Sequence, residues 1–409
     1  MKHLLQYIWV ISLLVTLSSC DSSQPLMPQT GNWNFSFDLR EGVDLEVSAR
    51  LSEEQGTYRL SFDNGGEDIV MDEVTMHNDT LRTQFPVFLS YLEGKLVSAN
   101  EWKGYFYDPS RGPDYKIPFS AQLGEKSTPP TSTAVSLDET WDVLFSPGTE
   151  DEYPAIGKFQ IASDGTARGT FLTETGDYRF LHGILVDSQL TLNTIDGAHL
   201  FVFEAQLQVD GQLSGSFYSG KHWQEPWTAK VNPEATLRDP DVLTVLNEGY
   251  DALSFSFPNM AGDSVRFPSD AYKGKAVVVQ ILGSWCPNCM DETRLLTQWH
   301  QTYHDQGLEI IGLAFERSES TAGVERMKES MGVPYEILLA STTTSKRTAA
   351  EKLPMLNHVL SYPTSIWIGR DGTIRKIHTG FNGPGTGVPY QQFVTEYQAL
   401  IEKMLAEEA

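Results

Sequence analysis

The sequence predicts a multidomain protein in which an all-β module of two related units, sandwich or barrel-like, precedes a C-terminal α/β domain. Three observations predict this. The chain has 409 residues, more than one ordinary hydrophobic core requires. Residues 31–231 contain short alternating strands broken by Asn-Gly and Asp-Gly turns, with no helical period of useful length. After Pro233 the pattern changes to strands that alternate with helices, which is typical of an α/β domain.

The first residues of the chain are typical of a secretion signal. A basic start precedes an apolar run, Leu4 to Leu17, that is too short to span a bilayer comfortably. The run ends in Leu17-Ser18-Ser19-Cys20, which resembles the lipobox of bacterial lipoproteins and implies that Cys20 is acylated. We therefore expect a lipoprotein signal peptide at 1–19 and a tether at 20–30, with the chain anchored to a membrane through Cys20. The alternative is an ordinary cleaved signal with an incidental cysteine.

The all-β region carries signs of an internal duplication. We predict one β-unit at 31–123 and a second at 137–231, joined by a stretch rich in Ser, Thr and Pro from Gly124 to Ser136. Three short segments recur a little over a hundred residues apart. They are Gly31-Asn32-Trp33 with Glu139-Thr140-Trp141, Gly104-Tyr105-Phe106-Tyr107 with Gly215-Ser216-Phe217-Tyr218, and Pro118-Phe119-Ser120-Ala121 with Pro226-Trp227-Thr228-Ala229.

A helical linker is expected at 232–252, with its helix from Asp241 to Tyr250, and an α/β domain at 253–409. The nearly continuous apolar run from Ala276 to Leu282 is typical of a central strand covered on both faces. The remaining expected elements alternate between the two types. They are a helix at Asp291–His304, a strand at Leu308–Phe315, a helix at Thr321–Met331, strands at Tyr335–Leu339, Ser365–Ile368 and Thr373–His378, and a helix at Tyr390–Ala406.

Two cysteines in the mature chain lie at the turn between the first central strand and its helix. Three cysteines in all exclude a disulfide-stapled framework, so each thiol needs its own explanation. Cys286 and Cys289 form a C-x-x-C motif at the start of the helix, where free backbone N–H groups and the helix dipole stabilise a thiolate. Pro287 suits the first helical turn. We predict a redox-active disulfide in which Cys286 attacks a substrate disulfide and Cys289 resolves the mixed disulfide.

Composition and spacing exclude other classes of site and partner. With 54 acidic against 30 basic side chains, the net charge of −24 argues against a nucleic-acid partner. A lone C-x-x-C also occurs as half of a zinc site, but no second ligand pair stands at a suitable spacing and the nine histidines are scattered. We expect neither a metal nor a cofactor.

Residues 255–380 resemble the thioredoxin fold, and specifically the TlpA/ResA-like branch of extracytoplasmic thiol-disulfide oxidoreductases within the AhpC/TSA-redoxin superfamily. Four stretches of sequence carry the resemblance. They are Phe257-Pro258-Asn259 with Gly262, Lys273-Gly274-Lys275, Trp285-Cys286-x-x-Cys289, and Tyr362-Pro363-Thr364 followed by Gly369-Arg370-Asp371-Gly372. The resemblance implies a cis peptide bond before Pro363 that faces the disulfide and leaves the Tyr362 backbone to pair with an extended substrate segment.

The resemblance also implies roles for side chains around the motif. Glu292, one helical turn after Cys289, is expected to exchange a proton with it, although a glutamate is also a common helix former. Glu316 is a weaker candidate for a second buried carboxylate. Five residues are expected to contact substrate: Trp285, Pro287, Asn288, Tyr362 and Thr364.

We therefore predict a thiol-disulfide oxidoreductase that faces the periplasm in the bacterial cell envelope. It is expected to act on protein thiols and disulfides in the reducing direction, and to receive electrons from an upstream membrane donor. There are three alternatives, and the sequence argues against the first two. A peroxiredoxin needs a Pro and Thr pattern that Gly283-Ser284-Trp285 does not provide, and a copper chaperone of related fold needs cysteines four apart. A binding or surface lipoprotein would use the β-module to engage a partner and keep the C-terminal domain as an auxiliary.

Overall fold

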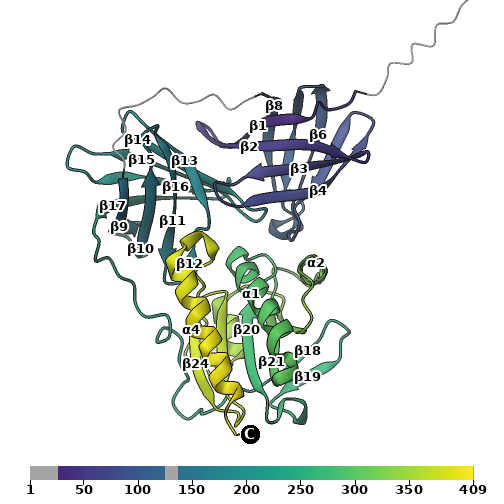
Figure 1. Cartoon of the computed structure of the whole chain (residues 1–409), viewed down its shortest axis with the longest axis vertical. Helices are drawn as coiled ribbons and strands as arrows, with labels where there is room; N and C mark the ends of the chain where they lie inside the picture. Colours follow the sequence, from purple (N-terminus) through teal and green to yellow (C-terminus); the bar gives the residue numbers. More distant parts are fainter. Residues whose placement is uncertain (1–25, 125–136, 409) are drawn as a thin grey trace, which may run out of the picture.

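The structure is a computed structural model that describes residues 26–124 and 137–408. Two β-barrels lie side by side above a C-terminal α/β domain, and the chain ends at the far side of that domain (Figure 1). The predicted signal peptide at 1–19, Cys20 and residues 125–136 of the predicted joining stretch lie outside the described residues. Within the described part of the chain, no helix combines the length and the apolar character needed to cross a membrane.

The first barrel closes eight antiparallel strands in chain order, because β1 pairs with both β2 and β8. Alternate side chains of each strand point into the barrel, as the two-residue period of a strand requires. The strands are β1 (Gly31–Arg40), β2 (Val43–Glu54), β3 (Thr57–Asp63), β4 (Asp68–His77), β5 (Thr80–Gln84), β6 (Tyr91–Ser98), β7 (Glu101–Tyr107) and β8 (Lys116–Leu123), with a 3-10 turn η1 (Pro109–Arg111).

The second barrel has the same plan, with one short additional strand. The pairing of β10 with both β9 and β11 closes eight strands, while β12 pairs only with β11. The strands are β9 (Leu137–Phe145), β10 (Tyr153–Ile161), β11 (Thr166–Thr173), β12 (Gly176–Asp177), β13 (Leu181–Val186), β14 (Gln189–Ile195), β15 (Leu200–Leu207), β16 (Leu213–Ser219) and β17 (Trp223–Val231). The two β-units are therefore barrels, and the sandwich alternative is wrong.

The duplication predicted from the recurring segments is visible in the strand register. Each segment occupies the first, seventh or eighth strand of its barrel, and the first strand pairs with the last in the same way in both. The equivalent pairs are Trp33–Leu123 and Trp141–Val231, Phe35–Ala121 and Val143–Ala229, and Phe37–Phe119 and Phe145–Trp227. Both barrels are filled by aromatic side chains, and Ile195, Leu200, Val202 and Tyr218 of the second pack on the core of the first.

The predicted linker helix at Asp241–Tyr250 is wrong. The segment forms turns, Leu246 makes an isolated bridge with Leu356, and the Asn247 side chain donates to two carbonyl oxygens of the C-terminal domain, at 3.0 and 2.9 Å. A ten-residue helix is marginal on its own. Here the segment makes its hydrogen bonds with the C-terminal domain, so it forms turns instead of a helix.

The C-terminal domain has a five-stranded sheet in the order β22-β21-β20-β23-β24, in which β20, β21 and β22 pair in parallel and β23 pairs antiparallel with both β20 and β24. The predicted central strand and helices are confirmed, although α1 begins four residues earlier than predicted and α3 was not predicted. The elements are β18 (Phe255–Pro258), β19 (Ser264–Phe267), β20 (Ala276–Leu282), α1 (Pro287–Tyr303), β21 (Leu308–Phe315), α2 (Ala322–Met331), β22 (Glu336–Ser341), α3 (Lys346–Lys352), β23 (Thr364–Ile368), β24 (Ile374–Thr379) and α4 (Val388–Leu405).

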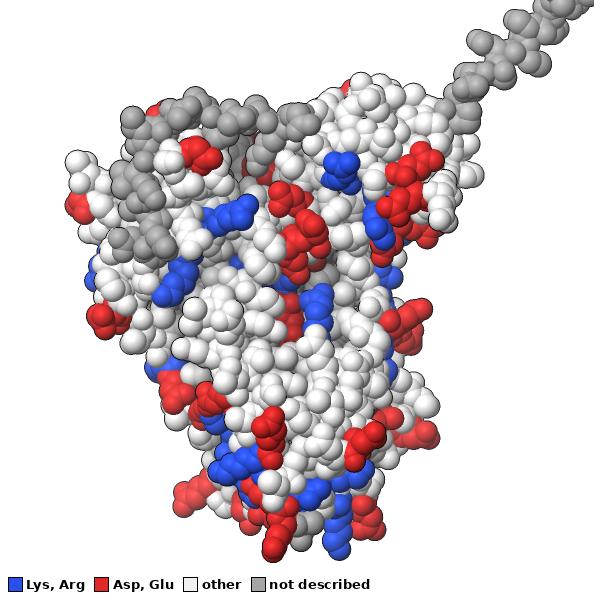
Figure 2. Space-filling view, in the orientation of Figure 1, with Lys and Arg blue, Asp and Glu red and all other residues white. Residues whose placement is uncertain are grey.

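Figure 2 shows how charge is distributed on one face of the molecule. Acidic side chains are spread over both barrels and the C-terminal domain, with fewer basic ones between them. This face therefore carries a dispersed negative charge rather than a basic surface that would suit a phosphate backbone.

Candidate redox site

The two cysteines lie where strand β20 turns into helix α1. Cys286 is the N-cap residue of α1, in an extended conformation, and Pro287 takes the first helical position. The backbone N–H of Cys289 donates to Cys286 Sγ at 3.3 Å, which places the sulfur at the positive end of the helix. The motif therefore lies at the start of the helix, as predicted for Cys286 and Pro287, although the helical pattern alone predicts a start at Asp291.

The two thiols have different environments. Both are free cysteines, with Cys286 6% exposed and Cys289 fully buried. Burial, together with the neighbouring Cys286 thiol, raises the pKa of Cys289 well above its usual value. Cys289 therefore becomes a nucleophile only when a nearby group takes its proton.

The turn that precedes β23, the antiparallel neighbour of β20, faces the Cys286 sulfur. The Cys286 thiol donates to the carbonyl oxygen of Tyr362 at 3.2 Å, and the Tyr362–Pro363 peptide bond is cis, as the resemblance implied. The Trp285 ring lies 5.6 Å from the Tyr362 ring in an edge-on arrangement. Trp285 is held by a hydrogen bond of 2.9 Å from its indole nitrogen to the Phe315 carbonyl oxygen.

A buried carboxylate stands one helical turn beyond Cys289. Glu292 is fully buried. Burial raises the pKa of its carboxyl to about 7, although the hydrogen bond from Gln280 acts to lower this pKa. Gln280 Nε2 donates to Glu292 Oε2 at 2.8 Å and also to the Cys289 carbonyl oxygen at 3.3 Å. Gln280 thus connects the two residues. Sequence reasoning missed it, although a lone polar residue inside the apolar run of β20 was a signal.

Glu316 lies behind the turn rather than beside the sulfurs. Its carboxylate accepts from the backbone N–H and the hydroxyl of Ser284, at 2.8 and 2.6 Å, and burial raises its pKa. The neighbouring Arg317 guanidinium lies 4.7 Å from the Trp285 ring centre. These contacts hold the turn that precedes Cys286, so the structure places Glu316 in a supporting position.

Two residues expected to contact substrate have other partners. Thr364 is fully buried and donates its hydroxyl to the Ser361 carbonyl oxygen at 2.9 Å, and its contact with substrate stays a prediction. Asn288 donates its side-chain amide to the carbonyl oxygens of Asp177 and Phe381, each at 3.1 Å. Asp177 belongs to the second barrel, and the sequence gave no sign of this contact.

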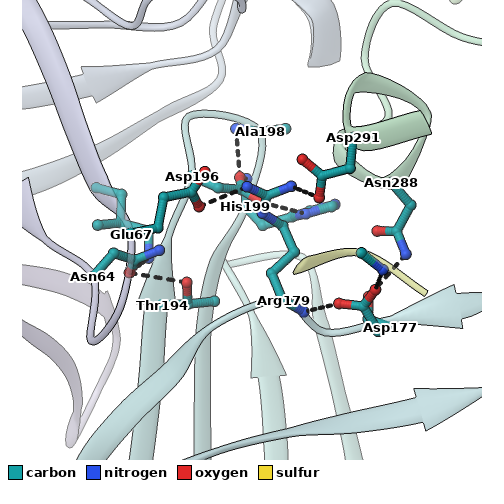
Figure 3. A network of polar contacts seen from close by, with 12 residues as sticks. Asn64, Glu67, Asp177, Arg179, Thr194, Asp196, Ala198, His199, Asn288 and Asp291 are labelled. Carbon is teal, nitrogen blue, oxygen red and sulfur yellow. Dashed lines mark hydrogen bonds and ion pairs between the residues drawn. The ribbon is translucent and has the colours of Figure 1, made fainter. Parts of the chain in front are cut away.

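A network of charges joins both barrels to the redox helix (Figure 3). Arg179 of the second barrel forms ion pairs with Glu67 of the first barrel at 2.6 Å, with Asp196 at 3.8 Å, and with Asp291 in the first turns of α1. The Arg179 side chain is 6% exposed. Since the network is buried and spans three domains, the β-module is docked on the helix that carries the cysteines.

A cluster of three possible metal ligands lies further along α1. Nitrogen and oxygen atoms of His300, His304 and Glu309 come within 4.8 Å of one another among the described residues. Glu309 already pairs with Lys275 at 2.6 Å. The cluster is separate from the cysteines, and the expectation of a metal-free redox site stays a prediction.

Comparison with known proteins finds a family and several relatives that match the C-terminal domain. Residues 249–377 match the AhpC/TSA family. The thiol-disulfide oxidoreductase ResA of Halalkalibacterium halodurans is 28% identical over 159 residues, which are 38% of this chain and 77% of that protein. ResA of Bacillus subtilis is 29% identical over 135 residues, 33% of this chain and 69% of the relative.

A more distant relative and a solved structure match the same region. The thiol:disulfide interchange protein DsbE of Vibrio cholerae is 25% identical over 169 residues, 41% of this chain and 82% of that protein. A crystal structure of a putative thiol:disulfide interchange protein DsbE from Chlorobium tepidum is 20% identical, covering 40% of this chain and 100% of its own, with a TM-score of 0.31. Residues 249–377 of this chain therefore match the AhpC/TSA family, and the same region is similar to the ResA thiol-disulfide oxidoreductases.

Proposed function

We propose that this chain is a thiol-disulfide oxidoreductase of the bacterial cell envelope that reduces disulfides of protein substrates through Cys286 and Cys289. The observation that carries the proposal is the position of Cys286 Sγ, which receives the Cys289 backbone N–H at a helix N-terminus and faces the Tyr362 carbonyl oxygen. The names of the relatives support the same reaction class. The lipobox-like segment ending at Cys20 supports an extracytoplasmic location and a lipid anchor.

The reaction proceeds in two exchange steps. The Cys286 thiolate attacks one sulfur of a substrate disulfide, that S–S bond breaks, and the other substrate sulfur leaves as a thiolate. Cys289 then gives its proton to the ionised carboxylate of Glu292 and attacks Cys286 Sγ, which releases the second substrate thiolate and forms the Cys286–Cys289 disulfide. Two electrons pass from the enzyme to the substrate, and an upstream membrane donor restores the dithiol.

The reducing direction rests on the environment of the cysteines. The high pKa of Cys289 keeps the resolving sulfur protonated until a substrate disulfide has reacted with Cys286. A binding lipoprotein remains the alternative, in which the β-module engages a partner. The packed aromatic interiors of both barrels argue against a ligand inside them.

The test is a count of free thiols in the full chain after oxidation and after dithiothreitol, with a Cys286→Ser/Cys289→Ser double variant as background. We expect reduction to release the two thiols of Cys286 and Cys289, and the reduced chain to reduce protein disulfides. A count that is unchanged by dithiothreitol, in a chain that reduces no disulfide, would refute the proposal and favour the binding alternative.

A further inference from the structure

A short segment of the second barrel lies against the redox turn. We call residues 173–180, which include β12, the rim segment. The hydroxyl of Ser361, the residue before Tyr362, donates to the Thr175 carbonyl oxygen at 2.6 Å. The backbone N–H of Gly383 donates to Asp177 Oδ2. The Asn288–Asp177 hydrogen bond and the Arg179–Asp291 ion pair add to these contacts. Together they fix the rim segment beside the cysteines, so the β-module limits the access of a substrate to Cys286 from this side.

An open cavity of about 410 Å³ remains between the rim segment and the redox turn. Asn288, Leu360 and Tyr362 line it from the C-terminal domain, whereas Tyr153 and Tyr178 line it from the barrel. Asn288 stands two positions after Cys286 in the sequence, and the Tyr362 carbonyl oxygen accepts the hydrogen bond from the Cys286 thiol. The cavity is therefore next to the sulfur that reacts, and it holds one or two side chains but no folded domain.

The walls of this cavity are mostly apolar, and the hydroxyl groups of its two barrel tyrosines have partners within the barrel. Tyr153 donates its hydroxyl to Glu225 Oε1 at 2.8 Å inside the barrel mouth, and the two tyrosine hydroxyls lie 2.8 Å apart. Since Tyr153 gives its hydrogen to Glu225, Tyr178 gives its own to Tyr153. The barrel thus presents the aromatic rings to the cavity.

We propose that this cavity is a substrate subsite built jointly by the second barrel and the redox domain. Its occupant is the apolar or aromatic side chain next to the reacting cysteine in an extended, disulfide-bearing polypeptide segment. This inference rests on the proposed function and adds a substrate class to it. Cys286 is only 6% exposed and the rim segment is fixed beside it, so an extended segment reaches the sulfur where a folded surface does not.

The experiment compares two disulfide-linked peptides that differ only in the residue next to the cysteine, phenylalanine in one and glycine in the other. Hydroxyethyl disulfide, which needs no subsite, reports the redox chemistry alone. The variant Pro154→Trp fills the cavity from an exposed position, whereas Ser214→Trp adds the same side chain at an exposed strand position away from it. Leu360→Ala removes apolar wall from the other side.

We expect the full chain to favour the phenylalanine peptide by about tenfold or more in kcat/KM. Pro154→Trp should abolish this preference and leave hydroxyethyl disulfide reduction unchanged, Leu360→Ala should reduce the preference, and Ser214→Trp should change neither. Equal rates with both peptides in the unmodified chain, or a preference that survives both cavity variants, would overturn the subsite. Failure of the unmodified chain to reduce any of the three disulfides would instead refute the proposed function.

Discussion

The side-chain amide of Gln280 donates a hydrogen bond of 2.8 Å to Glu292 Oε2, and both side chains are fully buried. The same nitrogen donates to the carbonyl oxygen of Cys289 at 3.3 Å. A carboxyl group in this position has a pKa of about 7 because burial penalises its charge. It can therefore change protonation state near neutral pH, beside the thiol that has to lose a proton.

Replacing Glu292 by glutamine should slow the resolution of the mixed disulfide by about 100-fold at neutral pH, since the amide cannot accept the Cys289 proton. In the unmodified chain the resolution rate should rise with pH through about 7, as Glu292 becomes ionised. The measurement is the release of substrate thiol from a preformed mixed disulfide across pH. Glu319→Gln, at an exposed position, is the control. Matching pH profiles for the unmodified chain and Glu292→Gln would exclude this role.

The same carboxyl should make stability depend on pH. Its pKa is raised from 4.5 to about 7 in the folded chain, so between these values the folded chain binds more protons than the unfolded chain. The stabilisation is complete below about pH 4.5 and is lost as pH rises through about 7. The difference between the two pKa values corresponds to about 3 kcal/mol.

Chemical unfolding at several pH values checks this expectation. The unmodified chain should lose free energy of unfolding relative to Glu292→Gln as pH rises through the window, because the glutamine variant does not ionise. A difference between the two chains that stays constant from about pH 4 to about pH 8 would contradict the assignment.

Cys289→Ala should trap substrate proteins as mixed disulfides on Cys286, because the resolving sulfur is absent. The adducts should disappear on reduction and should be missing from the Cys286→Ala/Cys289→Ala double variant, as judged by non-reducing electrophoresis and mass spectrometry. An active Cys286→Ala variant together with a Cys289→Ala variant that forms no adduct would show that the nucleophile has been assigned to the wrong sulfur.

Arg179→Met should destabilise the chain by about 3–5 kcal/mol, because it removes the buried guanidinium that pairs with the carboxylates of Asp196 and Asp291. It should also loosen the β-module from the redox helix and increase proteolysis at the contact. Arg168→Met, on an exposed position of β11, is the matched control. Unfolding free energies for the two variants that agree within about 0.5 kcal/mol would argue against a linking role for Arg179.

Local sequence determined the reactive turn and the central strand. The run from Ala276 to Leu282 is apolar on both faces, and the helix that follows starts with Pro287, so Cys286 at the N-cap follows from short-range chemistry. The recurring segments indicated two related β-units for a similar reason. The period of two and the positions of the tryptophans are local features, and equivalent residues in both barrels have the same register.

Tertiary structure alone decided the closure of the barrels, the non-helical linker and the partners of the redox helix. Closure depends on which strands pair at the ends of each unit, and the linker pairs with residues more than a hundred positions away. Asn288 meets Asp177, and Asp291 meets Arg179, only because the second barrel docks on α1. No periodicity in a single chain encodes such long-range contacts, so the sequence by itself identified the sulfurs while the packing of three domains decided what surrounds them.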